Sequence, residues 1–228
     1  MSDTDSFIDE VTEEVRRDRL FGLMRRYGWI ALLAVVALVG AAAYNEWSKA
    51  RAQAAAEATG DAVLAALQQD DATARIDALT AAETETPGAQ AVVRLLATAE
   101  AANEAPDQAA SLLLALADDS AAPQVYRQIA TLKAAMLPDS GLDLATRKAR
   151  LEGLTGGTGQ IRLLAEEQLA LLAVEEGDID GAIATLQAIL NDAEVTQGLL
   201  RRASQVIVAL GGEPEIAGAD AVVATPAD

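Results

Sequence analysis

The chain has 228 residues, with 35 acidic against 17 basic side chains and a formal net charge of −18. This balance argues against nucleic acid as a partner, because a nucleic-acid binder neutralises phosphates with clustered Lys and Arg. The sequence contains no Cys and no His, which excludes disulfide bonds and removes the commonest general base and the commonest metal ligand.

Residues 1–26 form a short arm before an apolar run. Apolar side chains recur every fourth residue at Phe7, Val11 and Val15, which predicts a helix with one apolar face. Such a helix could lie on the inner leaflet or dock on a membrane partner, or it could be a frayed helix that keeps the N-terminus soluble. The pattern leaves both interpretations open.

Residues 27–47 have the length and composition of a transmembrane helix. No charge interrupts the run from Tyr27 to Tyr44, and a helix from Trp29 to Trp47 would span roughly 27 Å, close to a hydrocarbon core. Each end carries a Tyr and a Trp, whose amphipathic rings favour the membrane interface. A buried core helix needs no such aromatic pairs, and the long acidic arm is unlike the short basic start of a cleavable signal peptide. We therefore expect an uncleaved anchor.

The orientation of the span follows from the positive charges beside it. Arg25 and Arg26 stand directly before it, with further arginines in the arm, whereas only Lys49 and Arg51 follow closely. We expect the N-terminus in the cytoplasm and everything after the span exported. In a Gram-negative bacterium this is a single-pass inner-membrane protein with a periplasmic domain.

Residues 48–210 read as helices separated by breakers. Good helix formers follow the span, and nothing before Gly60 would stop the membrane helix from continuing. No segment alternates like a strand with β-branched or aromatic enrichment, so the predicted fold class is all-α. The breakers are Asp70/Asp71, Pro87/Gly88, Pro106, Pro123, Pro138 to Gly141, Gly153 to Gly159 and Gly177.

The regular spacing of these breakers suggests a repeat. In the clearest unit a glycine turn joins two helices, and small residues let the helices approach closely, as in a tetratricopeptide repeat (TPR). Its expected packing residues are Leu169, Ala170, Gly177, Ala182, Leu186 and Ile189. Counting back from Ala182, alanines at matching positions fall at steps of 37, 36 and 35, at Ala145, Ala109 and Ala74. The TPR length is about 34 residues.

Two basic islands interrupt the acidic domain, Arg147/Lys148/Arg150 and Arg201/Arg202. Each is either a solvated helix face or a contact for an acidic partner or a lipid headgroup. The Gly-rich stretch 153–160 lacks the preceding strand and the following Lys of a phosphate loop, so it is a helix connection. Residues 211–228 combine Gly, Pro and acids without periodicity, which predicts a disordered tail.

Several motifs occur together in one order: the opening SDTDSFIDEVTEEVRRDRLFGLMRRYGW, the membrane segment RRYGWIALLAVV, an Ala-rich linker after Trp47, and repeat helices ending in ALGGEPE. This layout resembles the TPR-like membrane proteins related to the ancillary Sec translocon subunit YfgM, and the opening is similar to alphaproteobacterial members. The resemblance covers nearly the full chain. It implies a periplasmic TPR-like domain that associates with the translocon and with periplasmic chaperones, and it supplies no catalytic motif.

A helical-repeat domain on a membrane anchor predicts binding, because a solenoid presents an extended face and the anchor raises its local concentration. We expect a protein-protein interaction module that is an accessory subunit or chaperone adaptor of the Sec translocon or of membrane-complex assembly. A structural subunit of another inner-membrane complex, such as a respiratory complex, is the alternative. An exported enzyme that uses carboxylates is a third reading, disfavoured by the absent His and the few aromatic residues. We expect no catalytic residue, metal or cofactor.

Overall fold

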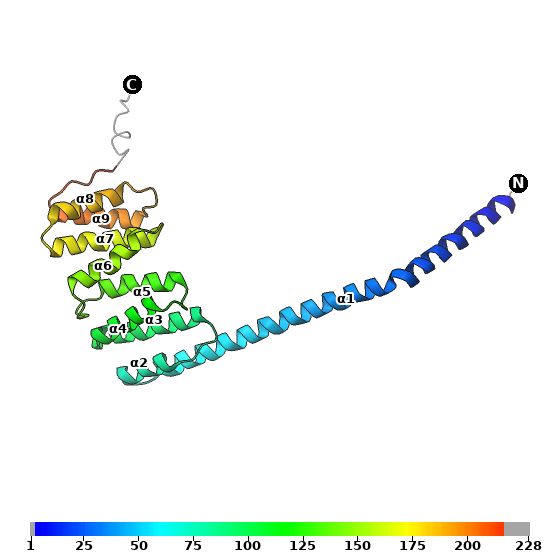
Figure 1. Cartoon of the computed structure of the whole chain (residues 1–228), viewed down its shortest axis with the longest axis horizontal. Helices are drawn as coiled ribbons and strands as arrows, with labels where there is room; N and C mark the ends of the chain where they lie inside the picture. Colours follow the sequence, from blue (N-terminus) through cyan, green and yellow to red (C-terminus); the bar gives the residue numbers. More distant parts are fainter. Residues whose placement is uncertain (1–2, 217–228) are drawn as a thin grey trace, which may run out of the picture. The chain divides into compact units, whose positions relative to one another are not determined.

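The computed structural model describes the backbone of residues 3–216 and the side chains of residues 25–30 and 32–216. Within these residues the chain forms nine helices and no strand (Figure 1), which confirms the all-α prediction. The chain divides into two units, Met1–Glu57 and Ala58–Asp228. The helices are α1 (Asp3–Leu67), α2 (Ala72–Ala81), α3 (Pro87–Glu104), α4 (Pro106–Asp118), α5 (Gln124–Met136), α6 (Leu144–Thr155), α7 (Gln160–Glu175), α8 (Ile179–Leu190) and α9 (Gln197–Ala209).

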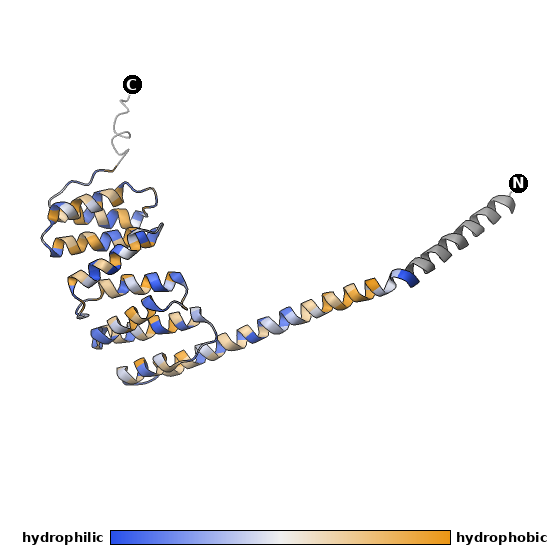
Figure 2. Ribbon diagram, in the orientation of Figure 1, coloured by the Kyte–Doolittle hydropathy of each residue, from blue (hydrophilic) through white to orange (hydrophobic). Residues whose placement is uncertain are grey.

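From Asp3 onward the first unit is a continuous helix, the greater part of α1. Between Arg25 and Leu67 this helix is long and apolar enough to cross a membrane, and none of its most apolar window is buried inside the protein. Figure 2 shows a hydrophobic run directly after the hydrophilic start of this stretch, and mixed residues beyond that run. Uncovered apolar surface of this length favours a lipid environment, in agreement with a single-pass anchor near the N-terminus. The side chains of the apolar stripe predicted in the arm lie outside the described residues.

No break separates the predicted span from the domain that follows it. The helix continues past Trp47 and through Gly60, and it ends at Leu67, just before the predicted breaker Asp70/Asp71. The last turns of α1 belong to the second unit, where Ala66 packs with Leu79 of α2 and Val93 of α3.

The helices of the second unit begin where the sequence supplies caps. Asp71, Thr86 and Asp143 each accept a hydrogen bond from the backbone N–H three residues later, which satisfies a donor that the first helical turn leaves free. Pro87 and Pro106 occupy the first position of α3 and α4, where the missing N–H costs nothing. One boundary was not predicted: α8 ends at Leu190 and α9 begins after its cap Thr196, without Gly or Pro between them.

The core of the second unit consists of several small apolar clusters in sequence order, each formed by consecutive helices. One joins α3, α4 and α5, the next joins α5, α6 and α7, and the last joins α7, α8 and α9. Successive helices pack side by side (Figure 1), and α5 additionally contacts both α3 and α7. Each helix therefore packs mainly with close neighbours in sequence.

The alanines at matching positions differ in their burial. Ala109 and Ala182 are fully buried and Ala74 is half-buried, as expected for close helix packing. Ala145 is exposed, so it does not share the buried position of Ala109 and Ala182. Ala109 and Ala182 are each the fourth residue of their helix, whereas Ala145 is the second residue of α6. Two residues correspond to a rotation of about 200°, which turns Ala145 away from the core.

Candidate functional site

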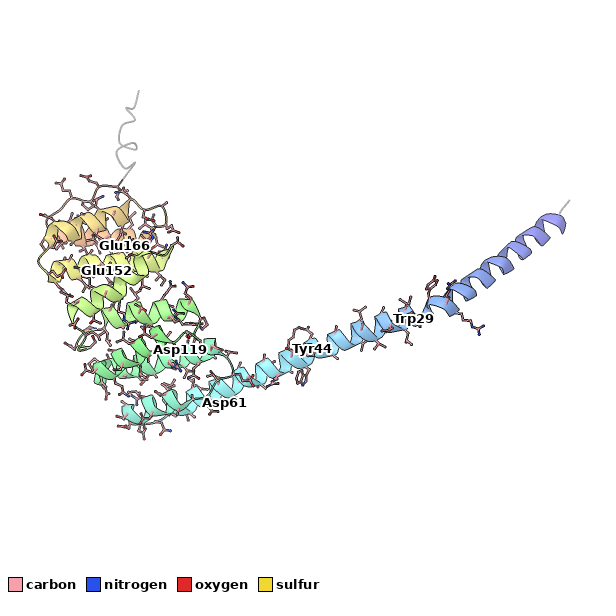
Figure 3. The ribbon with its side chains drawn as sticks, viewed as in Figure 1. Trp29, Tyr44, Asp61, Asp119, Glu152 and Glu166 are labelled. Atoms are coloured by element: carbon pink, nitrogen blue, oxygen red, sulfur yellow. The ribbon has the colours of Figure 1, made fainter. Side chains whose placement is uncertain are left out.

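The aromatic residues predicted to anchor the span lie at its two ends with exposed side chains: Tyr27, Trp29, Tyr44 and Trp47 (Figure 3 labels Trp29 and Tyr44). The rings of Tyr44 and Trp47 lie 6.1 Å apart. The guanidinium of Arg26 lies 5.9 Å from the Tyr27 ring, and that of Arg51 lies 6.0 Å from the Trp47 ring. A cation beside aromatic rings at each end suits the two polar interfaces of a bilayer.

The first basic island is tied to neighbouring helices. On α6, Arg147 pairs with Glu175 at 3.0 Å and its Nε donates to the carbonyl of Ala135. Lys148 pairs with Glu176 at 2.9 Å, and Arg150 donates to both carboxylate oxygens of Asp118. The guanidinium of Arg150 holds the pKa of Asp118 below its ordinary value. These cations bridge α6 to the ends of α7 and α4.

The two arginines of the second basic island differ in their ion pairing. Arg202 on α9 forms an ion pair with Glu167 on α7, whereas the exposed Arg201 forms no ion pair with any described residue. Outside the islands, Arg94 bridges α3 to Asp119 after α4 (Asp119 is labelled in Figure 3). Arg162 bridges α7 to Asp192 after α8. Basic side chains in this domain therefore serve mainly as links between helices.

A groove with a volume of about 570 Å³ lies across α5, α7 and α9. Most of its lining is aliphatic: α5 contributes its last turn, α7 contributes two leucines, and α9 contributes its C-terminal half. The lining residues are Leu132, Met136, Leu164, Glu167, Gln168, Leu171, Arg202, Gln205, Val206 and Ala209. The groove can therefore bury apolar side chains of a ligand.

One ion pair lies in the groove lining. Glu167 is only 6% exposed, and Nε and Nη2 of Arg202 donate to its two oxygens at 2.9 Å each. This bond to Glu167 raises the pKa of Arg202. Because the carboxylate and the guanidinium neutralise each other, the groove lining carries no net charge.

Two further hollows adjoin the groove at the C-terminal end of α5. One, of about 210 Å³, lies toward α3 and includes Lys133. The other, of about 410 Å³, includes the α5–α6 turn with Asp139. Met136 lines the groove and both hollows, and its side chain is 47% exposed. The three spaces therefore meet at Met136.

The groove was not predicted, although the sequence carries a signal for it. Met136, Leu171 and Val206 recur at steps of 35 residues, so the same repeat position is apolar in three successive units. On α7, Leu163 and Leu172 are buried in the core while their neighbours Leu164 and Leu171 line the groove. An apolar residue on both sides of a helix indicates a second contact surface.

The predicted repeat-packing residues fall into two core clusters. Ala170, Ala182, Leu186 and Ile189 are buried together between α7, α8 and α9, whereas Leu169 packs half-buried against the cluster of α5, α6 and α7. Gly177 forms the turn between α7 and α8 with φ +82°, a conformation that favours glycine. No group of three or more His, Cys, Asp or Glu side chains within the described part of the chain could hold a metal ion.

Comparisons with known proteins add no relative to this geometry. The chain matched no protein-family model, no curated protein and no solved structure.

Proposed function

We propose that this chain is a membrane-anchored protein-protein interaction module whose groove across α5, α7 and α9 binds a segment of a partner protein. In this proposal it acts as an accessory subunit or chaperone adaptor of the Sec translocon or of membrane-complex assembly. The observation that carries the proposal is an open, aliphatic, internally neutralised groove on a helical domain that follows a helix of membrane-spanning length.

The helix arrangement supports a TPR-like solenoid. The second helices of successive pairs, α2, α4, α6 and α8, begin at residues 72, 106, 144 and 179, close to the TPR spacing of about 34 residues. The first helices α3, α5 and α7 contact one another in turn, so they form a continuous wall. Because α5, α7 and α9 line the groove, a bound segment would contact several repeats at once.

The chemistry of the groove favours a polypeptide ligand over a substrate. A glycosidase-type mechanism needs two carboxyl groups that flank one bond. The groove offers only Glu167, and Arg202 occupies both of its oxygens. Aliphatic side chains at the surface of several helices are instead suited to an amphipathic helix laid into a groove. The groove is therefore better suited to binding a polypeptide segment than to this carboxylate chemistry.

In this proposal the anchor keeps the helical domain close to a membrane. Arg25 and Arg26 at the start of the span favour an N-terminus in the cytoplasm and a domain in the periplasm of a Gram-negative cell. Restricting the domain to the membrane surface raises its concentration near membrane complexes and emerging chains.

A structural subunit of another membrane complex is the second candidate. The uncovered span favours it, because the same apolar surface could pack against other transmembrane helices. In that case the span, and not the groove, would hold the complex together.

Isolation of the intact complex separates these candidates. The full chain, tagged after Asp228, is extracted in native lipid particles, and the co-purifying subunits are quantified. If the groove holds the partner, Met136→Asn reduces the recovery of partner subunits and Val125→Asn does not. Val125 is the matched control because it lies on the same helix, is 50% exposed and does not line the groove. Unchanged recovery with the Met136 variant would contradict binding through the groove.

A further inference from the structure

We infer that the segment bound by the groove is apolar and carries a Lys or Arg at one end, placed so that this basic side chain lies beside Asp139. This inference rests on the proposed function and adds the chemistry of the partner to it. Three features of the domain lead to it: the exposed methionine, the position of Asp139, and the charge of the chain.

Met136 is the natural contact for the apolar part of the ligand. It is the last residue of α5, it is nearly half exposed, and it lines all three adjoining spaces. Methionine is flexible and polarisable, so it adapts to side chains of different shape. Leu171 lines both the groove and the hollow that holds Asp139, so one ligand could occupy the two together.

Asp139 gives this end of the site its negative charge. It is exposed in the α5–α6 turn, and it forms no ion pair or side-chain hydrogen bond with any described residue. The other charges in the same hollow, Arg147 and Glu175, neutralise each other in an ion pair. The C-terminal ends of α5 and α7 also lie here, and their helix dipoles add partial negative charge.

The remaining charges near the groove do not reverse the preference of this site for a basic side chain. Glu167 and Arg202 cancel within the groove, and Lys133 lies in the adjoining hollow toward α3 and lines neither the groove nor the hollow of Asp139. The whole chain carries a net charge of −18, so its field attracts a basic ligand and repels an acidic one. An acidic end beside Asp139 would therefore be disfavoured by both the local and the overall charge.

Two fluorescent peptides with the same Leu/Ala helical core test the inference, one ending in two lysines and the other in two glutamates. Their binding to the full chain in nanodiscs of zwitterionic lipid is measured by anisotropy, with empty nanodiscs correcting for adsorption to lipid. We expect the Lys-ended peptide to bind at least about tenfold more tightly. Met136→Asn should weaken both peptides by about tenfold relative to Val125→Asn, since a central apolar contact carries much of the binding energy.

A conservative variant isolates the carboxylate. Asp139 has φ +52°, a conformation that asparagine adopts readily, so Asp139→Asn removes the charge and keeps the turn. This variant should weaken the Lys-ended peptide and leave the Glu-ended one unchanged or tighter. Asp77→Asn, at an exposed position on α2, is the matched control and should change neither.

The outcomes distinguish the inference from the function beneath it. If both peptides bind equally and Met136→Asn weakens both, the groove binds apolar segments but the inferred basic end is wrong. If Asp139→Asn leaves the preference for the Lys-ended peptide intact, the assignment of Asp139 is wrong. If neither peptide binds, or if Met136→Asn has no effect, both the inference and the proposed groove function are overturned.

Discussion

Replacing Ala182 with phenylalanine should destabilise the helical domain, because this small side chain is fully buried in the core between α8 and its neighbours. Ala182 is fully buried in the cluster that joins α7, α8 and α9, with Ala170 and Ala203 in the same cluster. A phenyl ring cannot enter this space without moving a helix or forcing an unfavourable rotamer. Overpacking of this kind costs about 1–3 kcal/mol in the free energy of unfolding.

The matching alanine of the preceding unit provides the control. Ala145 is the second residue of α6 and is exposed, so Ala145→Phe should change the free energy of unfolding by no more than about 0.5 kcal/mol. For a domain of this size, the cost at Ala182 corresponds to a fall in Tm of roughly 2–12 °C. Both variants are made in a fragment from residue 48 onward, and circular dichroism monitors its unfolding by urea and by heat. Equal shifts for the two variants would refute the assignment of these positions.

Three further predictions follow from charge. Changing Arg25 and Arg26 to Glu should weaken the orientation with the N-terminus in the cytoplasm. In a chain that keeps both arginines, a cysteine introduced at Ser48 should react with an impermeant thiol reagent from outside the inner membrane. Reaction only after the membrane is broken would reverse the proposed topology. Arg202→Met should cost about 1–3 kcal/mol by leaving the buried Glu167 carboxylate unpaired, and a second change of Glu167 to Met should recover most of it; a double variant as unstable as the single one would contradict this account. Stability should stay nearly flat between about pH 5 and 8, since the chain has no His, and should fall below about pH 4 as the carboxyls lose their charge. Four aspartates have a folded-state pKa below the unfolded value, because backbone N–H donors, or for Asp118 a guanidinium, stabilise the charged form; they are Asp118, Asp119, Asp143 and Asp192. Their stabilisation of the fold is therefore present above the unfolded pKa and is lost as the pH falls through the folded pKa. A constant urea midpoint down to pH 2 would contradict this prediction.

The parts of the fold that depend on local pattern could be predicted from the sequence. The all-α class, a helix of membrane-spanning length and the burial of Ala109 and Ala182 follow from hydropathy, breakers and periodicity. The failure at Ala145 has a local cause, because the longer connection before α6 changes the position of this residue within its helix. The missed boundary before α9 has no Gly or Pro, and its signals are the turn formers Asn191 and Asp192 and the N-cap Thr196.

The groove and the ion pairs depend on contacts between residues far apart in the chain. Met136, Leu171 and Val206 come from three helices, and only the repeat geometry brings them to one groove. Likewise, Arg202 and Glu167 are 35 residues apart, so their sequence positions alone do not identify them as partners. The 35-residue recurrence of apolar groove positions and the paired leucines of α7 are sequence signals that could have indicated this surface.

Site-specific crosslinking in living cells tests the central claim most directly. A photoreactive amino acid is placed at Met136 in the groove or at Val125, which is equally exposed on the same helix outside it. If the groove binds a segment of a membrane-complex partner, illumination crosslinks a defined partner subunit at Met136 and leaves Val125 uncrosslinked, and Leu171→Asn reduces the yield at Met136. The same crosslinks from both positions, or none from Met136 while the complex remains intact, would contradict the account.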